Sequence, residues 1–236
     1  MTETWQGRRV VLTGASRGIG YQSARLFLGQ GADVIGVARD EDRLIKTAQE
    51  LKSLGGTFTP LVADLADPAG PKKIADAAAA RWPALDLLIN NAAVQAWKPG
   101  WHAEGLELFD RHFQVNVRAQ HELIYRLAPL LKAGKQPRVV NVSSGAGSRQ
   151  ALQDSADGAT YKFTKYALNA LTILWASDLK GQVAVNSLDP GWLKTDLGGP
   201  HAPGEPEDGG RRMMEILGLP WAETGQFWHG AEALAF

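Results

Sequence analysis

Tyr161 and Lys165 stand four residues apart in the segment Tyr-Lys-Phe-Thr-Lys, and their types suit acid–base chemistry. On a helix, residues four apart share a face, so the two side chains would be neighbours. A free tyrosine has a pKa of about 10 and is a poor proton donor or acceptor at neutral pH. A neighbouring ammonium group stabilises the phenolate and lowers that pKa, which makes the pair a candidate general acid and base.

The spacing of this pair is common in helices and usually structural, so its place in the chain carries more weight. The apolar run 138–142 precedes it and is followed by Ser143 and Ser144. If that run is a strand, the serine hydroxyls lie at its carboxyl end, near the start of the helix. Ser144 is then a candidate second hydrogen-bond donor to a carbonyl oxygen.

A glycine-rich turn, Thr-Gly-Ala-Ser-Arg-Gly-Ile-Gly at 13–20, lies between an apolar run and an amphipathic segment. Glycine permits a tight turn, and the backbone N–H groups at the start of the following helix would approach a pyrophosphate. The spacing G-x-x-x-G-x-G differs from the common dinucleotide pattern G-x-G-x-x-G. The turn also lacks the Gly-Lys-Ser/Thr ending of a phosphate loop, which argues against a nucleotide triphosphatase.

The end of the second apolar run indicates which dinucleotide would bind. An acidic residue there would accept hydrogen bonds from a ribose 2′-hydroxyl and favour NAD. This chain has Ala38 and then Arg39, and Arg17 stands in the glycine turn. Two guanidinium groups bordering the ribose would bind a 2′-phosphate, so the sequence favours NADP over NAD.

The elements that must position these residues alternate along the whole chain, short apolar runs with longer amphipathic segments. This alternation predicts an α/β fold with a doubly wound parallel sheet of the Rossmann type, in three αβα layers. No repeat or break divides the chain, so one domain over 1–236 is expected. The expected strands are 8–13, 33–38, 58–63, 85–89, 138–142 and 183–188, and the expected helices are 18–30, 41–54, 68–81, 105–132 and 161–180.

Two segments, 144–160 and 189–210, read as long loops rich in glycine or proline. Both leave strands at the carboxyl edge of the predicted sheet, where ligands bind in folds of this kind. Trp97, Trp101 and Trp192 also fall on loops near that edge. They could line a substrate site, or equally pack the loops and a subunit contact.

Bulk composition limits the remaining classes of function. The 25 basic residues balance the 25 acidic ones, so no overall field attracts nucleic acid or an anionic membrane. Cysteine is absent, and the five histidines show no metal-ligand spacing, so no metal site is expected. The start of the chain lacks the pattern of a secretory signal, and no apolar run reaches ~20 residues, which favours a cytoplasmic protein.

These motifs, in this order, resemble the short-chain dehydrogenase/reductase family in its shorter, single-domain branch, and the resemblance covers nearly the whole chain. The glycine turn resembles the family's cofactor motif. Asn-Asn-Ala-Ala at 90–93 is similar to its N-N-A-G, and the segment 190–196 to its P-G-x-x-x-T. Ser144, Tyr161, Lys165 and Asn116 match its catalytic serine, tyrosine, lysine and asparagine. The tail at 206–228 looks like that of carbonyl-reductase-like members.

The resemblance implies reversible hydride transfer between NADP(H) and a small ketone, aldehyde or alcohol. Tyr161 would exchange the proton, Lys165 would lower the pKa of Tyr161 and hold the nicotinamide ribose, and Ser144 would orient the substrate oxygen. Asn116 would support a water-linked proton path to Lys165. The residues expected to bind the cofactor are Gly14, Ser16, Arg17, Gly18, Ile19, Gly20, Arg39, Asp64, Leu65, Asn90, Ala92, Tyr161, Lys165, Pro190, Gly191, Leu193 and Thr195.

Two departures from the family pattern concern the substrate wall. Ala93 replaces a glycine and would narrow the space near the nicotinamide, and the loop between Ser144 and Tyr161 is a few residues longer than usual. The segment 193–204 is expected to be a substrate loop, but its composition does not name the substrate. The resemblance also implies a homodimer or homotetramer paired through helices 105–132 and 161–180.

Three alternatives fit these residues less well than a carbonyl reductase or alcohol dehydrogenase does. A nucleotide-sensing regulator on the same fold has no need of an intact Ser144, Tyr161, Lys165 and Asn116. By resemblance, an enoyl reductase usually places the lysine further from the tyrosine. A sugar-nucleotide epimerase is usually longer, with a second substrate region.

Overall fold

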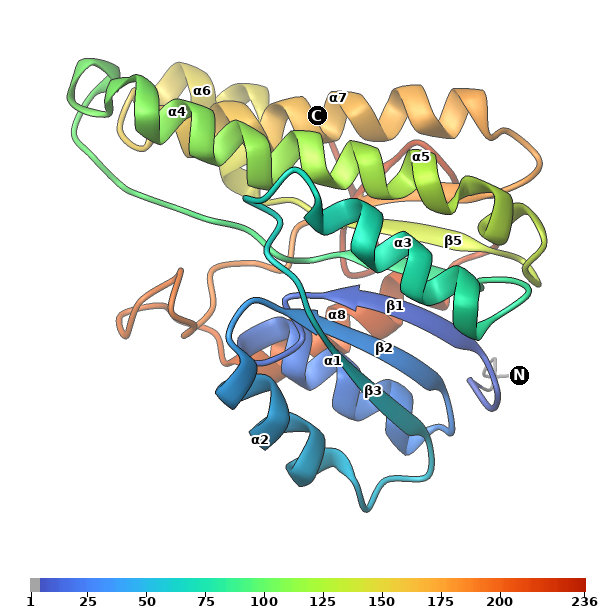
Figure 1. The fold of residues 1–236 in the computed structure, drawn as a ribbon. Helices are drawn as coiled ribbons and strands as arrows, with labels where there is room; N and C mark the ends of the chain where they lie inside the picture. Colours follow the sequence, from blue (N-terminus) through green and yellow to red (C-terminus); the bar gives the residue numbers. More distant parts are fainter. Residues whose placement is uncertain (1–4) are drawn as a thin grey trace.

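Eight strands form one sheet, in the order β3-β2-β1-β4-β5-β6-β7-β8, in the computed structural model, which describes residues 5–236 (Figure 1). All neighbours are parallel except β8, which runs antiparallel to β7. The central strands β4, β5 and β6 are buried at every position, as expected for a parallel sheet covered on both faces. The strands are β1 (Arg9–Thr13), β2 (Asp33–Ala38), β3 (Thr57–Val62), β4 (Leu87–Asn90), β5 (Arg138–Val142), β6 (Ala184–Leu188), β7 (Phe227–His229) and β8 (Glu232–Leu234).

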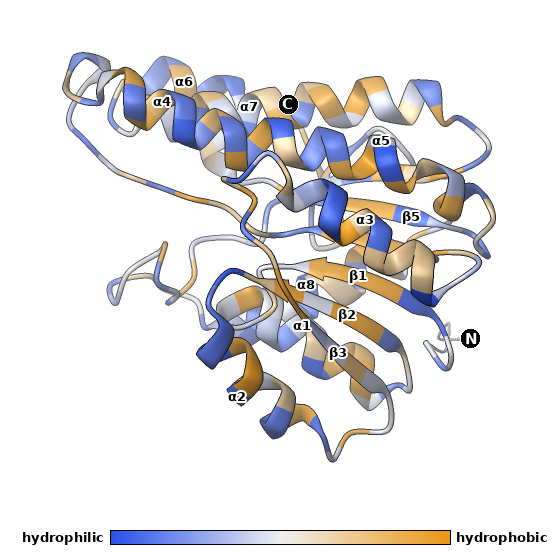
Figure 2. Ribbon diagram, in the orientation of Figure 1, coloured by the Kyte–Doolittle hydropathy of each residue, from blue (hydrophilic) through white to orange (hydrophobic). Residues whose placement is uncertain are grey.

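Helices cover both faces, which confirms the doubly wound α/β architecture (Figure 1). On one face lie α1 (Gly18–Gly29), α2 (Glu41–Leu51) and α8 (Pro206–Leu217), with α1 packed along α8. On the other lie α3 (Gly70–Arg81), α5 (Ala119–Lys132) and α7 (Ala159–Asp178). Each layer has its own apolar cluster, and Figure 2 shows the apolar strands between helices with polar outer surfaces. None of the helices in the described part of the chain combines the length and hydropathy needed to cross a bilayer.

The chain reverses its direction of winding between β1 and β4, which lie side by side although β2 and β3 separate them in sequence. The turns after these two strands therefore diverge and open a crevice at the carboxyl edge. Thr13 ties the two turns together. Its hydroxyl donates to the Ile89 carbonyl at 3.2 Å and accepts the N–H groups of Asn91 and Ala92, each at 3.0 Å.

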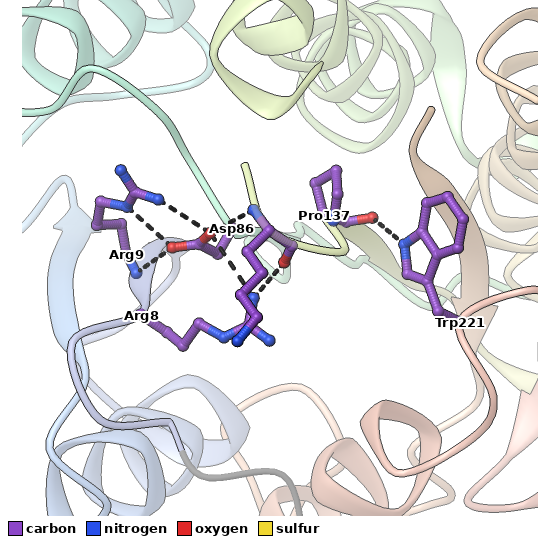
Figure 3. A network of polar contacts seen from close by, with 6 residues as sticks. Arg8, Arg9, Asp86, Pro137 and Trp221 are labelled. Carbon is purple, nitrogen blue, oxygen red and sulfur yellow. Dashed lines mark hydrogen bonds and ion pairs between the residues drawn. The ribbon is translucent and has the colours of Figure 1, made fainter. Parts of the chain in front are cut away.

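The opposite edge of the sheet is held by a buried carboxylate (Figure 3). Asp86 accepts the Arg9 backbone N–H and Nε, each at 2.9 Å, and the Lys135 N–H at 2.9 Å. Burial by itself raises the pKa of Asp86, but the hydrogen bonds and charge of Arg9 bring the pKa below its usual value. Trp221 donates to the Pro137 carbonyl at 3.0 Å and ties the C-terminal segment to the same edge.

The structure differs from the sequence-based elements in four places. The helix expected over 105–132 is interrupted by a π-helical turn, η2 (Gln114–Arg118), between α4 (Gly105–Phe113) and α5. The expected loop 144–160 contains a short helix, α6 (Arg149–Asp154). Helix α8 begins at Pro206, inside the expected loop 189–210. Strands β7 and β8 were not predicted, because each has only three residues and β7 joins the sheet by pairing with the distant β6.

Candidate active site

A cavity of about 1070 Å³ occupies the crevice at the carboxyl edge of the sheet. Its walls come from the turns after β1, β2, β3, β4, β5 and β6, and from the first turns of α1 and α7. Segments 91–104 and 189–205 both extend past the sheet on this side (Figure 1). The volume is at the upper end of the range for ligand pockets, roughly 300–1,000 Å³, so an extended ligand such as a dinucleotide would fit.

The glycine turn after β1 forms one end of this cavity. Gly14 has a φ of +69°, and a Cβ there would lie 2.7 Å from Asn91 Nδ2, so only glycine fits. The residue before α1, Arg17, makes no side-chain cap, and no acidic residue occupies the first turn of that helix. The N–H groups at its N-terminus are therefore available to an anion, as the sequence predicts.

Gly20 differs from the other glycines of the turn because it does not line the cavity. A Cβ at Gly20 would lie 2.1 Å from the Gly14 carbonyl oxygen. Gly20 would therefore not contact the cofactor itself. It allows helix α1 to lie close to the turn after strand β1.

Three arginines line the cavity where β1 and β2 end: Arg17, Arg39 and Arg43. Arg17 is ion-paired with Asp196, and the Arg43 guanidinium lies 3.6 Å from the same carboxylate. Burial, followed by the charges of Arg43 and Arg39, lowers the pKa of Arg17, because the three cations repel one another. Arg43 was missed in the sequence. The signal for Arg43 was its position in the first turn of the helix that begins two residues after Arg39.

Ser144, Tyr161 and Lys165 all line the same cavity, so the fold brings the predicted trio together. Ser144 follows β5, and Tyr161 stands in the first turn of α7. Lys165 Nζ donates to the Val142 carbonyl at 2.7 Å and lies 5.7 Å from the centre of the Tyr161 ring. The Ser144 hydroxyl accepts the Ala146 N–H at 3.1 Å, which fixes its position at the strand end.

Burial dominates the ionisation of this trio. The pKa of Tyr161 is raised to about 12: burial is the main cause, a hydrogen bond with Ser144 opposes it, and the charge of Asp189 adds to the rise. Burial likewise lowers the pKa of Lys165 to about 7. Desolvation disfavours the charged form of both groups, and the expected lowering of the Tyr161 pKa by Lys165 stays a prediction. At neutral pH the tyrosine is therefore protonated.

Two asparagines of the expected site lie behind the cavity wall instead of in it. Asn90, the last residue of β4, is fully buried and donates to Asn141 Oδ1 at 2.8 Å. The next residue, Asn91, lines the cavity in its place and donates to the Thr13 carbonyl at 2.9 Å. The reason is the alternation of side chains along an extended chain, which points neighbours to opposite faces.

Asn116 lies in the π-helical turn η2 and is also fully buried. Its Oδ1 accepts the Val94 N–H at 2.9 Å, and its Nδ2 donates to the Val94 carbonyl at 2.9 Å and to Thr164 Oγ1 at 3.1 Å. The expected water-linked path to Lys165 is not tested by these direct contacts and stays a prediction. What the contacts do show is that Asn116 anchors the loop after β4.

The remaining expected cofactor residues line the cavity: Ser16, Gly18, Ile19, Asp64, Leu65, Ala92, Pro190, Gly191, Leu193 and Thr195. Asp189, which the sequence analysis did not select, lines it as well. Its carboxylate accepts the Gly191 N–H at 3.0 Å and lies 3.2 Å from His229 Nδ1. Among residues 5–236, no cluster of three or more histidine, aspartate or glutamate side chains is arranged to hold a metal ion.

The donors around this cavity fit a phosphorylated dinucleotide. Arginines lie at one end, the open N-terminus of α1 lies beside the glycine turn, and the tyrosine and lysine of α7 lie further along, with the lysine bound to the end of β5. The carboxylate that directly follows Arg39, that of Asp40, caps helix α2: its Oδ1 accepts the Arg43 N–H at 3.0 Å.

Comparisons with known proteins agree with this arrangement. The sequence model of the short chain dehydrogenase family matches residues 8–205. A short chain dehydrogenase of Pseudocercospora fijiensis is 31% identical over 83% of this chain, and the match spans 62% of that protein. Carbonyl reductase [NADPH] 1 of Sus scrofa is 28% identical, with 90% of this chain and 88% of that protein covered.

A solved structure gives the same result for the fold. The NADPH-bound carbonyl reductase from chicken fatty liver superimposes with a TM-score of 0.87 and 27% sequence identity. The superposition covers 98% of this chain and all of the other, 100%. The three-layer arrangement and the cavity therefore belong to a fold known to hold NADPH in that protein.

Proposed function

This chain belongs to the short chain dehydrogenase family of oxidoreductases, and from this premise we propose that it transfers hydride between NADP(H) and a small carbonyl or alcohol substrate. The observation that carries the proposal is the meeting of Ser144, Tyr161 and Lys165 in the cavity whose far end holds three arginines. The three proteins compared above are all described as dehydrogenases or reductases. None of them supports the nucleotide-sensing alternative.

The chain's own groups would hold the cofactor along the crevice. The arginine cluster would bind the 2′-phosphate, and the N-terminus of α1 would bind the pyrophosphate. Asp64 and Leu65 follow β3 and would border the adenine, while Pro190 and Thr195 would border the nicotinamide. When bound, the nicotinamide supplies or accepts the hydride.

At the reacting end, Tyr161 would hold and move the proton. A pKa of about 12 keeps its hydroxyl protonated at neutral pH, which suits donation to a carbonyl oxygen as that oxygen gains negative charge. Ser144 would hydrogen-bond the same oxygen. Lys165, buried and with a pKa of about 7, would respond to any anion brought close to it, because a nearby negative charge favours its protonated form.

The experiment is NADPH consumption with a panel of ketones and aldehydes by the wild type and by Tyr161→Phe. The variant keeps the ring and loses the proton, so turnover should fall by ~10²–10⁴-fold, the usual effect of losing a general acid. NADPH affinity, measured by fluorescence titration, should stay the same. Tyr166→Phe is the matched control, because Tyr166 lies on the same helix and outside the cavity. A Tyr161→Phe enzyme that keeps a tenth of wild-type turnover would exclude Tyr161 as the acid.

A further inference from the structure

Two tryptophans line the cavity with much of their surface uncovered. Trp97 is 53% exposed and Trp192 is 60% exposed, and both border the cavity that holds Tyr161. Single exposed aromatic side chains are common, but apolar side chains that border a cavity with a few polar groups are typical of ligand sites. The contacts of each indole show that it is held in one position beside the cavity.

Trp97 is held against the start of α7. A Cβ at Gly158 would lie only 2.6 Å from Trp97 Cε3, so the ring packs directly on the glycine backbone, which has a φ of +64°. The Gly158 N–H donates to the Lys98 carbonyl at 3.0 Å, next to the tryptophan. The ring therefore has one face covered by the helix start and another part open to the cavity.

Lys162 supports the same ring. Its side chain is buried, and its ammonium donates to the carbonyls of Ala151 at 3.1 Å and Ser155 at 2.8 Å. The same ammonium lies 5.6 Å from the centre of the Trp97 ring, within the range of a cation–π contact. The proposed proton transfer does not use this buried cation, and its contacts make it a positioning residue for Trp97.

The loop that carries Trp97 is anchored on both sides of it. Before it, the Ala96 N–H donates to His112 Nε2 at 2.9 Å. After it, the Gly100 N–H donates to Asp157 Oδ1 at 3.0 Å, and the buried Glu104 accepts the Thr160 N–H at 2.7 Å. These bonds join the loop after β4 to α4 and to the start of α7, so the position of Trp97 is set by tertiary contacts.

Trp192 is fixed in a different way. Its Nε1–H donates to the Gly198 carbonyl at 2.7 Å, which satisfies the polar edge of the indole within its own loop. Its backbone carbonyl accepts the Gly204 N–H at 3.3 Å. The exposed part of the ring is consequently apolar and has no hydrogen-bonding group left to offer.

The order of the strands puts these two rings on either side of the reacting groups. Trp97 follows β4, Ser144 follows β5 and Trp192 follows β6, and these three strands are consecutive in the sheet. A carbonyl hydrogen-bonded by Ser144 and Tyr161 would thus have an indole on each side of its substituents.

The charges near the rings disfavour an anionic substrate. Lys194 is ion-paired with Glu205, and Asp189 adds a negative charge to this side of the cavity. Within the described chain, the other cations lining the cavity are the three arginines at the far end and the buried Lys165. An anionic group beside the rings would have to compete with Glu205 for Lys194 and would share the cavity with the Asp189 carboxylate, so its charge would be less well paired than in water.

We propose that Trp97 and Trp192 form an aromatic clamp that selects uncharged carbonyls attached to a flat ring, and that Lys162 positions Trp97 within it. This inference rests on the proposed function for its reaction, but the clamp itself is a statement about binding. It predicts that flatness and neutrality of the substrate matter more than its size.

The test compares matched substrates with NADPH. Acetophenone and cyclohexyl methyl ketone are similar in size, and only the first is flat. Stacking should raise kcat/KM for acetophenone, relative to its cyclohexyl analogue, about two- to tenfold more in the wild type than in Trp97→Leu or Trp192→Leu. Methyl 4-acetylbenzoate should be preferred at least about tenfold over 4-acetylbenzoate, since only the second carries a charge.

Trp101→Leu is the matched control, because Trp101 is 51% exposed on the same loop but does not line the cavity. It should leave both substrate ratios unchanged. Lys162→Met should raise KM for acetophenone more than KM for butanone, and Lys162→Arg should restore the KM for acetophenone. Equal losses on flat and non-flat ketones in the clamp variants, or a change of the substrate ratios in Trp101→Leu as large as in the clamp variants, would overturn the clamp.

A binding measurement separates the clamp from the reaction. Acetanilide, which the enzyme has no means of reducing, should bind the NADP-loaded wild type and lose about two- to tenfold in affinity in Trp97→Leu by calorimetry. If the wild type reduced no carbonyl, the proposed function would be wrong, but the acetanilide titration would still show whether the two tryptophans bind a flat ring. Undiminished acetanilide binding in both tryptophan variants would reject the clamp even in an active reductase.

Discussion

Arg39 offers a quantitative test of the cofactor assignment, because its charge is uncommitted. Arg17 and Arg43 both face Asp196, whereas Arg39 makes no ion pair with the described residues. Arg39→Leu therefore breaks no ion pair among the described residues, and its main cost should be the proposed bond to the 2′-phosphate. A hydrogen bond to a charged group contributes about 1.5–3 kcal/mol, so NADPH affinity should fall by roughly ten- to a hundredfold.

Arg17→Leu should weaken NADPH less than Arg39→Leu does. Before Arg17 binds the phosphate it must release Asp196, and an exposed ion pair of this kind is worth about 0–1 kcal/mol. That cost offsets part of the gain from the phosphate. Asp196→Asn removes the competing carboxylate and should tighten NADPH by up to about fivefold, while NADH affinity stays unchanged.

The assay is the ratio of kcat/KM for NADPH to that for NADH, together with dissociation constants from fluorescence titration. Arg149→Leu is the control, because Arg149 is exposed and lies outside the cavity. Added salt should weaken NADPH more than NADH in the wild type, and this difference should shrink in Arg39→Leu. A wild type that uses both cofactors equally, with a ratio that Arg39→Leu does not move, would end the NADP assignment and leave hydride transfer standing.

Three further predictions concern the catalytic end and the stability of the sheet. Lys165→Ala should lower both turnover and NADPH affinity; an unchanged dissociation constant would remove its proposed contact with the ribose. Because the Asp189 carboxylate raises the pKa of Tyr161, Asp189→Asn should lower that pKa and move the acid limb of alcohol oxidation to lower pH; a pH–rate profile that stays in place would contradict this electrostatic link. Asp86→Ala leaves buried donors unpaired and should cost about 3–5 kcal/mol in the free energy of unfolding by urea, against less than about 1 kcal/mol for the exposed Asp76→Ala. The pKa of Asp86 is lowered in the folded state, so its contribution to the free energy of unfolding is present at neutral pH and is lost as the pH falls through that pKa. The wild type should therefore lose stability in acid more steeply than Asp86→Ala, and equal slopes would refute the stabilising role of the Asp86 carboxylate.

The sequence alone predicted the fold class and most of the central strands. The patterns involved are local: apolar runs of five or six residues, amphipathic helices between them, and a glycine turn at 13–20. Residues 138–142, for example, form β5 with the same limits in the structure. The order of Ser144, Tyr161 and Lys165 along the chain was also sufficient to expect them at one edge, because parallel strands end at the same side of a sheet.

Other features depended on which distant segments pack together. Strands β7 and β8 are too short to show a periodic pattern, and they exist because β6 provides a partner for β7. The π-helical turn η2 within the helix expected over 105–132 has no sequence signal comparable to a proline or a glycine. Whether a helix continues or widens at such a point is decided by the contacts of residues such as Asn116 with neighbouring segments.

The same distinction applies to the site. Sequence order indicated Asn90, but the pleat of β4 turns Asn90 inward and gives the cavity Asn91. Arg43 and Asp196 are 153 positions apart, and only the fold brings them within 3.6 Å. The pKa of Tyr161 depends on burial, which a pattern of residue types does not specify. Neighbouring residues determine local backbone preferences. Burial, ion pairing and the packing of Trp97 against Gly158 arise only when the strands and helices assemble.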